Sequence, residues 1–161
     1  MTRVTISLRA AVPSDREAVV EFIHQLNVFE AALTGDRRVD YGAARSYYGE
    51  LQQRISRNGG RIVLAIADRQ VIAIMGFSLD EDAAYIVDDV RRHGTVTDLV
   101  VSEEWRGRGV GRMLLREAER LTRAAGYKRL LIGALAANER ARRTYQAFGF
   151  EPYVSILTKE L

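Results

Sequence analysis

The residues best suited to chemistry form a turn rich in glycine and arginine, Arg106-Gly107-Arg108-Gly109-Val110-Gly111. An apolar stretch precedes this turn, and an amphipathic pattern that predicts a helix follows it directly. Glycines let a backbone approach a ligand closely, and the first N–H groups of a helix are unpaired and lie at the positive end of its dipole. We therefore expect an anion site suited to phosphates, although solvated arginines on an ordinary strand-to-helix loop are the alternative.

Three phosphate-binding patterns compete for this turn. A Walker loop needs Lys and then Ser or Thr after its last glycine, whereas Gly111 is followed by Arg112. A dinucleotide-binding GxGxxG pattern needs a third glycine at position 112, which is arginine. The pattern Arg/Gln-x-x-Gly-x-Gly/Ala is matched by Arg106, Gly109 and Gly111.

The surrounding residues make this third pattern specific. The apolar run Leu99-Val100-Val101 lies upstream, and Asn138 is followed seven residues later by Tyr145 and then by Gly149-Phe150. In this context the chain resembles the GNAT superfamily of acetyl-coenzyme A dependent N-acetyltransferases. The resemblance extends over essentially the whole chain and weakens in residues 28–60 and 80–94.

The resemblance implies a site for acetyl-coenzyme A and no metal. The backbone of Arg106, Gly107, Arg108, Gly109, Val110 and Gly111 is expected to hold the pyrophosphate, with Arg112 nearby. The strand end Leu99, Val100 and Val101 is expected to pair with the pantetheine arm like an added β-strand, in the slot that opens where this strand splays from the next one. A backbone N–H near Val100 is expected to polarise the acetyl carbonyl. Asn138 is expected to contact the pantetheine, and its position also predicts a helix N-cap.

The same resemblance implies two catalytic residues. Tyr145 is expected to be the general acid that protonates the departing thiolate, or alternatively a core aromatic that shares a helix face with Phe148. Asp98 is the one carboxylate on the strand before the turn and is the candidate general base. A structural hydrogen bond is the alternative role for Asp98, and His93 is a weaker candidate for the base. Strict alternation predicts that Val96, Asp98 and Val100 share one face of this strand.

We therefore expect transfer of an acetyl group to a primary amine of a small molecule, by direct attack in a ternary complex. A protein N-terminus or lysine as acceptor, and a non-catalytic module that senses acyl-coenzyme A, are the alternatives. Residues 28–60 and 80–94 are expected to determine the acceptor. Their acidic side chains suit a cationic amine, although any single one is more often a solvated charge; they are Glu30, Asp36, Asp40, Asp80, Glu81 and Asp82.

Composition limits the other classes of function. The 161 residues, 47% of them apolar, predict a single domain over residues 1–161. The absence of cysteine excludes disulfides and a cysteine nucleophile, and two histidines are too few for a histidine-rich metal centre. The net charge of +3 does not indicate nucleic-acid binding.

Neither a signal peptide nor a membrane span is predicted, so a cytoplasmic location is expected. Homodimers are common in the family, and no residue here establishes one.

Charge is unevenly distributed along the chain. Residues 1–102 carry 12 basic and 14 acidic side chains, whereas residues 103–161 carry 12 basic and 7 acidic ones. The second part contains the glycine turn, and the first contains the segments expected to meet the amine. This distribution suits two substrates of opposite charge.

Periodicity predicts the elements that must position these residues. The order of these elements, together with the family resemblance, implies the fold class α/β (mixed α+β). This is a single GNAT-like domain with a central, mixed, mostly antiparallel twisted sheet of about six to seven strands, flanked by about four helices. A capping box of Ser14 and Glu17 is expected to start the first helix. Residues 80–94 are expected to form an irregular loop with one helical turn. Strands are predicted at 4–8, 61–67, 71–79, 95–101, 130–135 and 153–157, and helices at 14–29, 40–55, 109–125 and from 138.

Overall fold

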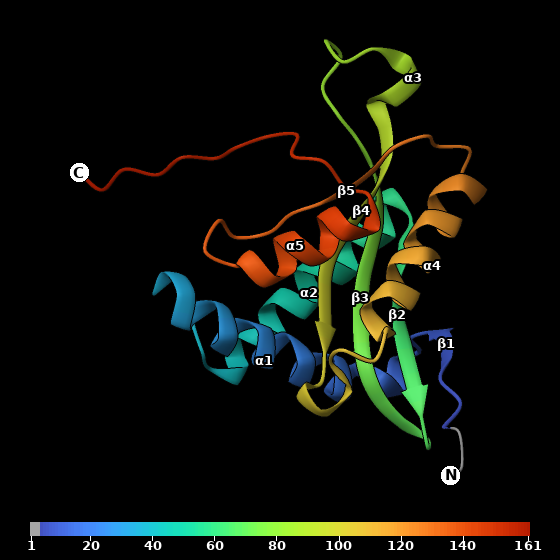
Figure 1. The fold of residues 1–161 in the computed structure, drawn as a ribbon, viewed down its shortest axis with the longest axis vertical. Helices are drawn as coiled ribbons and strands as arrows, with labels where there is room; N and C mark the ends of the chain where they lie inside the picture. The colour runs from blue at the N-terminus through green and yellow to red at the C-terminus, as the bar shows by residue number, and fades with distance from the viewer. Residues whose placement is uncertain (1–3) are drawn as a thin grey trace.

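The computed structural model describes residues 4–161, which form one sheet covered by helices on both faces (Figure 1). Five strands lie side by side in chain order, β1 to β5. The elements are β1 (Ser7–Ala10), a 3-10 turn (Pro13–Asp15), α1 (Arg16–Thr34), α2 (Tyr41–Asn58), β2 (Gly60–Ala67), β3 (Gln70–Glu81), α3 (Asp88–Arg91), β4 (Arg92–Val101), a 3-10 turn (Glu103–Trp105), α4 (Val110–Ala124), β5 (Leu130–Ile132) and α5 (Glu139–Phe148).

The sheet is mixed and mostly antiparallel, as predicted. Strands β1 to β4 pair antiparallel with their neighbours, whereas β4 and β5 pair in parallel. The turn between β2 and β3 contains Asp68 and Arg69, both with positive φ. Two consecutive positive φ values give a tight hairpin turn whose twist matches that of the flanking strands.

Two apolar layers sandwich the sheet. Because successive side chains of a strand point to opposite faces, Ile74 of β3 packs with α1 and α2, whereas the next residue, Met75, packs with α4. Both side chains are fully buried, as is Leu114 of α4. The sheet is thus a rigid wall between the α1–α2 side and the α4–α5 side.

The start of α1 differs from the predicted capping box. Residues Pro13–Asp15 form a 3-10 turn, and the α-helix begins at Arg16. The Asp15 carboxylate accepts the Val12 N–H at 2.8 Å and pairs with Arg9 at 2.7 Å, so Asp15 reaches back to the backbone three residues earlier, the role expected of Glu17, and Ser14 caps no helix. The predicted start of α2 is confirmed, because Asp40 accepts the Ala43 N–H at 2.9 Å.

Several predicted elements differ from those of the structure. The final strand expected at 153–157 is absent, because residues 149–161 form no helix or strand and the end of the chain extends away from the sheet (Figure 1). The described sheet therefore has five strands rather than six to seven. Residues 80–94 are more regular than expected, because β3 and β4 extend through Glu81 and from Arg92, and the predicted helical turn is α3. With α3 the described chain has five α-helices, one more than expected.

Among residues 4–161, no helix combines the length and the apolar character needed to cross a membrane.

Candidate active site

The glycine turn has the backbone conformation of an anion site. Gly107 and Gly109 have φ of +73° and +83°, a region that favours glycine. Gly109 is the N-cap residue of α4, and no side chain in the described chain caps this helix. The N–H groups of Val110, Gly111 and Arg112 therefore lack intrahelical partners and remain available to a ligand.

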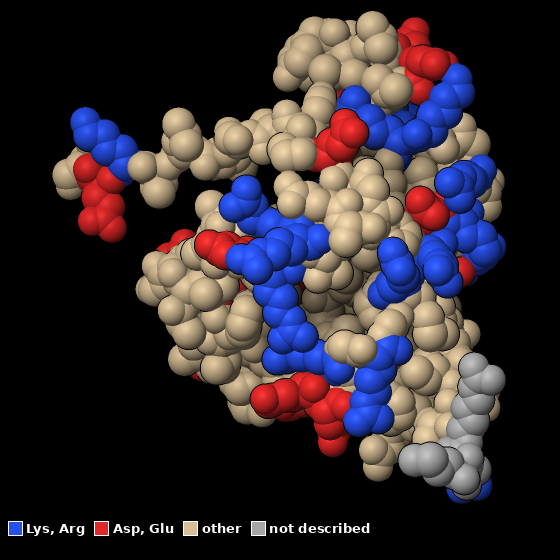
Figure 2. All heavy atoms as spheres, viewed as in Figure 1, with Lys and Arg blue, Asp and Glu red and all other residues tan. Residues whose placement is uncertain are grey.

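Arginine side chains surround the turn. The Arg106 Nε donates to the carbonyl oxygen of Val101 at 3.0 Å, which ties the turn to the end of β4. Arg106 and Arg112 line the cleft described below, whereas Arg108 lies over the Trp105 ring and outside the cleft lining. Figure 2 shows Lys and Arg side chains gathered on the face that carries α4 and α5.

A cleft opens where β4 and β5 separate. Their pairing covers only Gly94–Val96 of β4 and Leu130–Ile132 of β5. Beyond this point Leu99–Val101 and Gly133–Leu135 line a cleft of about 410 Å³. Strand β5 does not reach Leu99–Val101, so this edge of β4 can pair with an extended ligand. The splay expected from the family resemblance is present.

A β-bulge in β4 makes the prediction that Asp98 shares a face of the strand with Val96 wrong. Gly76 and Phe77 of β3 face Asp98 and Val96, so Thr97 is an extra residue in β4. Val96 consequently packs with the α4 layer, whereas Asp98 and Val100 face α1 and α2. Strict alternation fails at the bulge, and Asp98 lies on the face opposite to Val96.

Asp98 is a buried carboxylate, 7% exposed, that lines the cleft. Tyr47 of α2 donates its hydroxyl to Asp98 Oδ2 at 3.1 Å. Burial raises the pKa of Asp98, although the hydrogen bond from Tyr47 opposes the rise, and the negative charge of Glu30 adds to it. A raised pKa makes a carboxylate a stronger base than an ordinary aspartate.

Tyr145 lines the same cleft from α5. Its ring lies edge-on to Phe150, with centroids 6.1 Å apart, so the side chain also packs. Burial, with the charge of Glu30, raises the pKa of Tyr145 to about 12. The hydroxyl is therefore protonated at neutral pH and can act as a donor.

Asn138 and His93 occupy different places. Asn138 accepts the Ala141 N–H at 3.1 Å, which confirms the predicted N-cap, and it lines the cleft as well. His93 is buried near Asp82, with 3.3 Å between Nε2 and Oδ1, and is not part of the cleft lining. Five residues along a strand correspond to about 16 Å, so His93 is remote from the position of Asp98.

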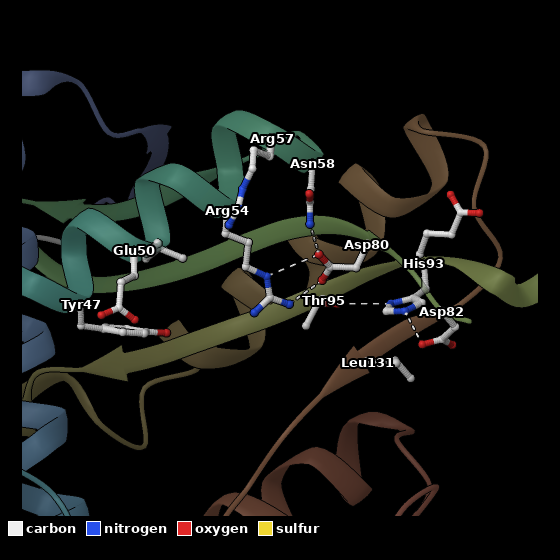
Figure 3. A pocket seen from close by; sticks show the side chains of 12 residues that line it. Tyr47, Glu50, Arg54, Arg57, Asn58, Asp80, Asp82, His93, Thr95 and Leu131 are labelled. Carbon is white, nitrogen blue, oxygen red and sulfur yellow. Dashed lines mark hydrogen bonds and ion pairs between the residues drawn. The ribbon is translucent and has the colours of Figure 1, made fainter. Parts of the chain in front are cut away.

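A second hollow of about 690 Å³ lies on the α2 side of the sheet (Figure 3). Arg54 reaches across it to Asp80, with 2.6 Å between Nη2 and Oδ2. Tyr47 lines this hollow and bonds to Asp98 in the cleft, so the two spaces meet at this pair. The described part of the chain contains no group of three or more potential metal-ligating side chains.

The acidic residues expected near the acceptor are divided between several places. Glu30 lines the cleft and accepts from Arg37 Nε at 2.8 Å. The cluster at 80–82 lines the second hollow. Asp36 pairs with Arg37, and Asp40 caps α2, so neither contributes to the cleft lining.

Sequence reasoning missed several residues of the site. Gln25, Leu26 and Phe29 of α1 line the cleft, and Tyr47 bonds to Asp98. The apolar stripe of α1 included Leu26 and Phe29, but a stripe does not distinguish core from cleft. Nothing in the sequence indicated Tyr47, because its contact with Asp98 joins residues 51 positions apart.

A family model described as "Acetyltransferase (GNAT) family" matches residues 26–150. No curated protein is significantly similar in sequence. Many solved structures are similar, among them a tetramutant of the BH1408 protein from Bacillus halodurans. That structure has a TM-score of 0.81 at 19% identity, and the alignment covers 96% of this chain and 99% of that one.

Two further similar structures contain a ligand. Aminoglycoside N-acetyltransferase AAC(6')-Iy in complex with CoA has a TM-score of 0.72 at 18% identity, with 99% and 97% of the two chains covered. A predicted acetyltransferase from Clostridium acetobutylicum with acetyl-CoA has a TM-score of 0.73 at 16% identity, with 97% and 96% covered. At such identities the likeness shows a common fold.

Proposed function

Because the chain belongs to the GNAT family of acetyltransferases, we propose that it transfers an acetyl group from acetyl-coenzyme A to the primary amine of a small molecule. One observation carries the proposal. A single cleft is lined by the glycine turn with Arg106 and Arg112, and also by the acidic residues Asp98 and Glu30 and by Tyr145. The basic and acidic parts of this lining suit an anionic donor and a cationic acceptor.

The coenzyme fits the turn and the open edge of β4. The free N–H groups of Val110, Gly111 and Arg112, together with the Arg106 and Arg112 side chains, suit the pyrophosphate. The unpaired edge at Leu99–Val101 suits the amide-containing pantetheine arm, which pairs like a strand. Asn138, which lines the cleft next to this arm, adds a polar contact.

The acidic side of the cleft suits a cationic amine. Glu30 and Asp98 both line it, and the charge of Glu30 contributes to the raised pKa of Asp98. An ammonium ion between them would relieve this repulsion. An amine with a pKa near 10 is neutral in only about one part in a thousand at pH 7, so Asp98, directly or through a water, takes its proton before attack.

Residues of this chain then serve the transfer. A backbone N–H near Val100 polarises the acetyl carbonyl. The neutral nitrogen attacks the carbonyl carbon, the C–S bond breaks, and the Tyr145 hydroxyl gives its proton to the leaving sulfur. Tyr145 regains a proton from solvent, and Asp98 releases its own. Direct attack is proposed because the chain contains no cysteine for an acyl-enzyme.

Release of the coenzyme A thiol, followed with acetyl-coenzyme A and a panel of acceptors, tests this proposal. The panel contains polyamines, amino acids, peptides with free N-termini or lysines, and aminoglycosides, the substrate class named for one similar structure. Release with a small amine supports the proposal. Release with peptides alone indicates a protein acetyltransferase, and tight binding without release for any acceptor indicates a sensor. The cytoplasmic location and the single domain over 1–161 remain predictions.

A matched pair of variants tests the acidic side of the cleft. Glu30→Gln should raise the KM for a cationic acceptor several-fold and leave the KM for acetyl-coenzyme A unchanged. Glu139→Gln is the control, because Glu139 pairs with Arg143 on the exposed face of α5. Equal effects of the two variants on acceptor KM would contradict the placement of the amine beside Glu30.

A further inference from the structure

The side chain of Asp98 is fixed by residues that do not line the catalytic cleft. Asp98 lines the cleft and is 7% exposed, whereas Tyr47, which donates a hydrogen bond to it, lines the second hollow (Figure 3). A carboxylate that serves as a base must be correctly oriented and must be ionised before it takes a proton. The residues that surround Asp98 on the α2 side control both properties.

One face of α2 carries the residues that reach this carboxylate. Tyr47, Leu51, Arg54 and Asn58 recur at helical spacing, which places them on one side of α2, and all four line the second hollow. The Tyr47 hydroxyl lies 3.1 Å from Asp98 Oδ2. Leu51, one turn further along, is 2% exposed and packs in the α1–α2 layer. Helix α2 therefore places a hydroxyl donor and an apolar cover over this part of the sheet.

The residue beneath the carboxylate is a glycine. Gly76 of β3 lies opposite Asp98 in the sheet, and opposite residues of an antiparallel pair have their side chains on one face. A Cβ at Gly76 would lie 2.9 Å from Asp98 Oδ2 and 3.4 Å from Leu51 Cδ2, and it would overlap the Thr97 hydroxyl. The φ of Gly76 is not positive, so its backbone does not require glycine. A glycine inside a strand often marks a close approach, and here the carboxylate occupies the space of the missing side chain.

Charged and polar groups from several elements act on the ionisation of Asp98. Burial raises the pKa of Asp98, and the negative charge of Glu30 of α1 adds to the rise. The hydrogen bond from Tyr47 and the positive charge of Arg54, both of α2, oppose it. The other titratable or charged side chains that line the cleft are Arg106, Arg112, Arg140 and Tyr145.

Tyr47 is well suited to remain a donor. Burial and the negative charge of Asp98 raise the pKa of Tyr47 far above its ordinary value, whereas the charge of Arg54 opposes the rise and that of Glu50 adds to it. The hydroxyl is therefore protonated at every pH at which the enzyme is expected to work. A donor that is always protonated favours the ionised form of the carboxylate that accepts from it.

We propose that Tyr47 is a positioning residue of the proposed reaction, which acts through Asp98: it holds Oδ2 ionised above Gly76, so that Oδ1 takes the proton of the amine. This inference rests on the proposed function, because it concerns the base of that reaction. Tyr47 does not line the cleft, so its effect on turnover comes through Asp98 and not through contact with either substrate.

The titration of Asp98 tests this role without any turnover. The carboxyl signals of isotope-labelled aspartate are followed by NMR against pH, and Asp98→Asn identifies the Asp98 signal by its loss. A hydrogen bond to a charged group corresponds to roughly 1–2 pKa units. Tyr47→Phe removes only the hydroxyl, so it should move the Asp98 midpoint to higher pH by about this amount. An unchanged midpoint overturns the inference and leaves the proposed function untouched.

The neighbouring tyrosine provides the matched control. The Tyr48 hydroxyl accepts from Gln52 Nε2 at 3.0 Å, and Tyr48 lines neither the cleft nor the second hollow. Tyr48→Phe therefore removes a hydroxyl from the same helix without touching Asp98. It should leave the Asp98 midpoint in place, and a shift as large as that of Tyr47→Phe would overturn the inference.

The pH dependence of turnover separates positioning from a general loss of structure. The acid limb of kcat/KM reports the base of the free enzyme, and it is measured with the best acceptor of the panel. Tyr47→Phe should move this limb to higher pH by the same roughly 1–2 units. Its deficit in kcat/KM should be about 10–100-fold on the acid side and should shrink as the pH rises, whereas damage to the fold lowers turnover at every pH.

Two results of this profile overturn the inference. A deficit that stays constant with pH shows that the hydroxyl serves packing alone. An acid limb that stays in place while the NMR midpoint moves shows that Asp98 is not the base. Absence of thiol release with every acceptor instead counts against the proposed function, and because the titration needs no acceptor, the two failures are distinguishable.

Discussion

Replacing Tyr145 with phenylalanine gives the sharpest test of the proposed chemistry. The change removes one hydroxyl from the cleft and keeps the ring that packs against Phe150. Stability should therefore change by less than about 1 kcal/mol. General acid catalysis contributes about 10²–10⁴-fold to a rate, so kcat should fall by roughly this factor while the KM for acetyl-coenzyme A stays similar.

The magnitude follows from the acidity of the two groups. The pKa of Tyr145 is raised to about 12, whereas an ordinary alkyl thiol such as that of cysteine has a pKa of about 8.5. Complete proton transfer from Tyr145 at this raised pKa to a thiolate of ordinary basicity would cost about 5 kcal/mol, at 1.36 kcal/mol per pKa unit. The same burial makes a thiolate in the cleft more basic, which narrows this gap. The hydroxyl therefore acts as a hydrogen-bond donor that completes transfer only as the C–S bond breaks.

Leaving groups of different basicity provide the decisive assay. Thiol release is measured for wild type and Tyr145→Phe with acetyl-coenzyme A and with an acetyl thioester of an acidic aryl thiol. The penalty in kcat/KM should be large for the first and small for the second, since an acidic thiol leaves without a proton. Tyr85→Phe is the control, because Tyr85 is exposed in the loop before α3. Full turnover of Tyr145→Phe, or an equal penalty with both donors, would refute the acid role.

Three other substitutions follow from the structure. Asp98→Asn should lower kcat at least 10²-fold. At pH values above the unfolded pKa of 3.8 it should also stabilise the protein, because burial raises the pKa of Asp98 in the folded state and so makes its ionisation unfavourable for folding. Urea unfolding at acid and at neutral pH should show a gain in stability that vanishes at low pH. Asp80→Asn should destabilise by about 1–3 kcal/mol at neutral pH, because bonds from Arg54, Asn58 and Ser78 outweigh burial and hold the Asp80 pKa below its usual range. In the same urea unfolding, this loss should be complete above the unfolded pKa of 3.8 and should shrink as the pH falls from there towards the lowered pKa of the folded protein. Gly60→Ala should destabilise the protein by about 3 kcal/mol or more, because a Cβ at this position would lie 2.1 Å from the Phe77 carbonyl oxygen. Gly35→Ala is the control: a Cβ there would have no atom within 4 Å, so the change should cost about 1 kcal/mol. Thermal unfolding of both variants measures the difference.

Residue patterns within one segment predicted the strands, helices, turns and caps whose conformation depends mainly on that segment's own residues. The alternation of apolar residues in β2 and β3 and the amphipathic pattern of α4 gave strands and a helix at nearly the observed bounds. The glycine turn was predictable because positive φ and an unpaired helix start are properties of a few consecutive residues. The Asn138 cap was predictable for the same reason.

Features that depend on pairing between distant segments were not predictable. The bulge at Thr97 arises from the register of β4 against β3, and it reverses the predicted face of Asp98 relative to Val96. The final strand at 153–157 has strand-forming residues but no partner in the described chain. A strand exists only where a neighbouring strand accepts its hydrogen bonds, and no single sequence reveals whether that neighbour is present.

The short parallel pairing of β4 and β5 also determines which part of the protein separates most easily from the rest of the domain. Three residue pairs join β5 to β4, and α5 contains no fully buried side chain. Segments with few buried contacts separate at a lower free energy than the whole domain. In native-state hydrogen exchange, the amides of β5 and α5 should therefore exchange well before those of β2, β3 and α4. A ligand lying between β4 and Gly133–Leu135 would slow exchange in this unit most, and product release then needs only this unit to move.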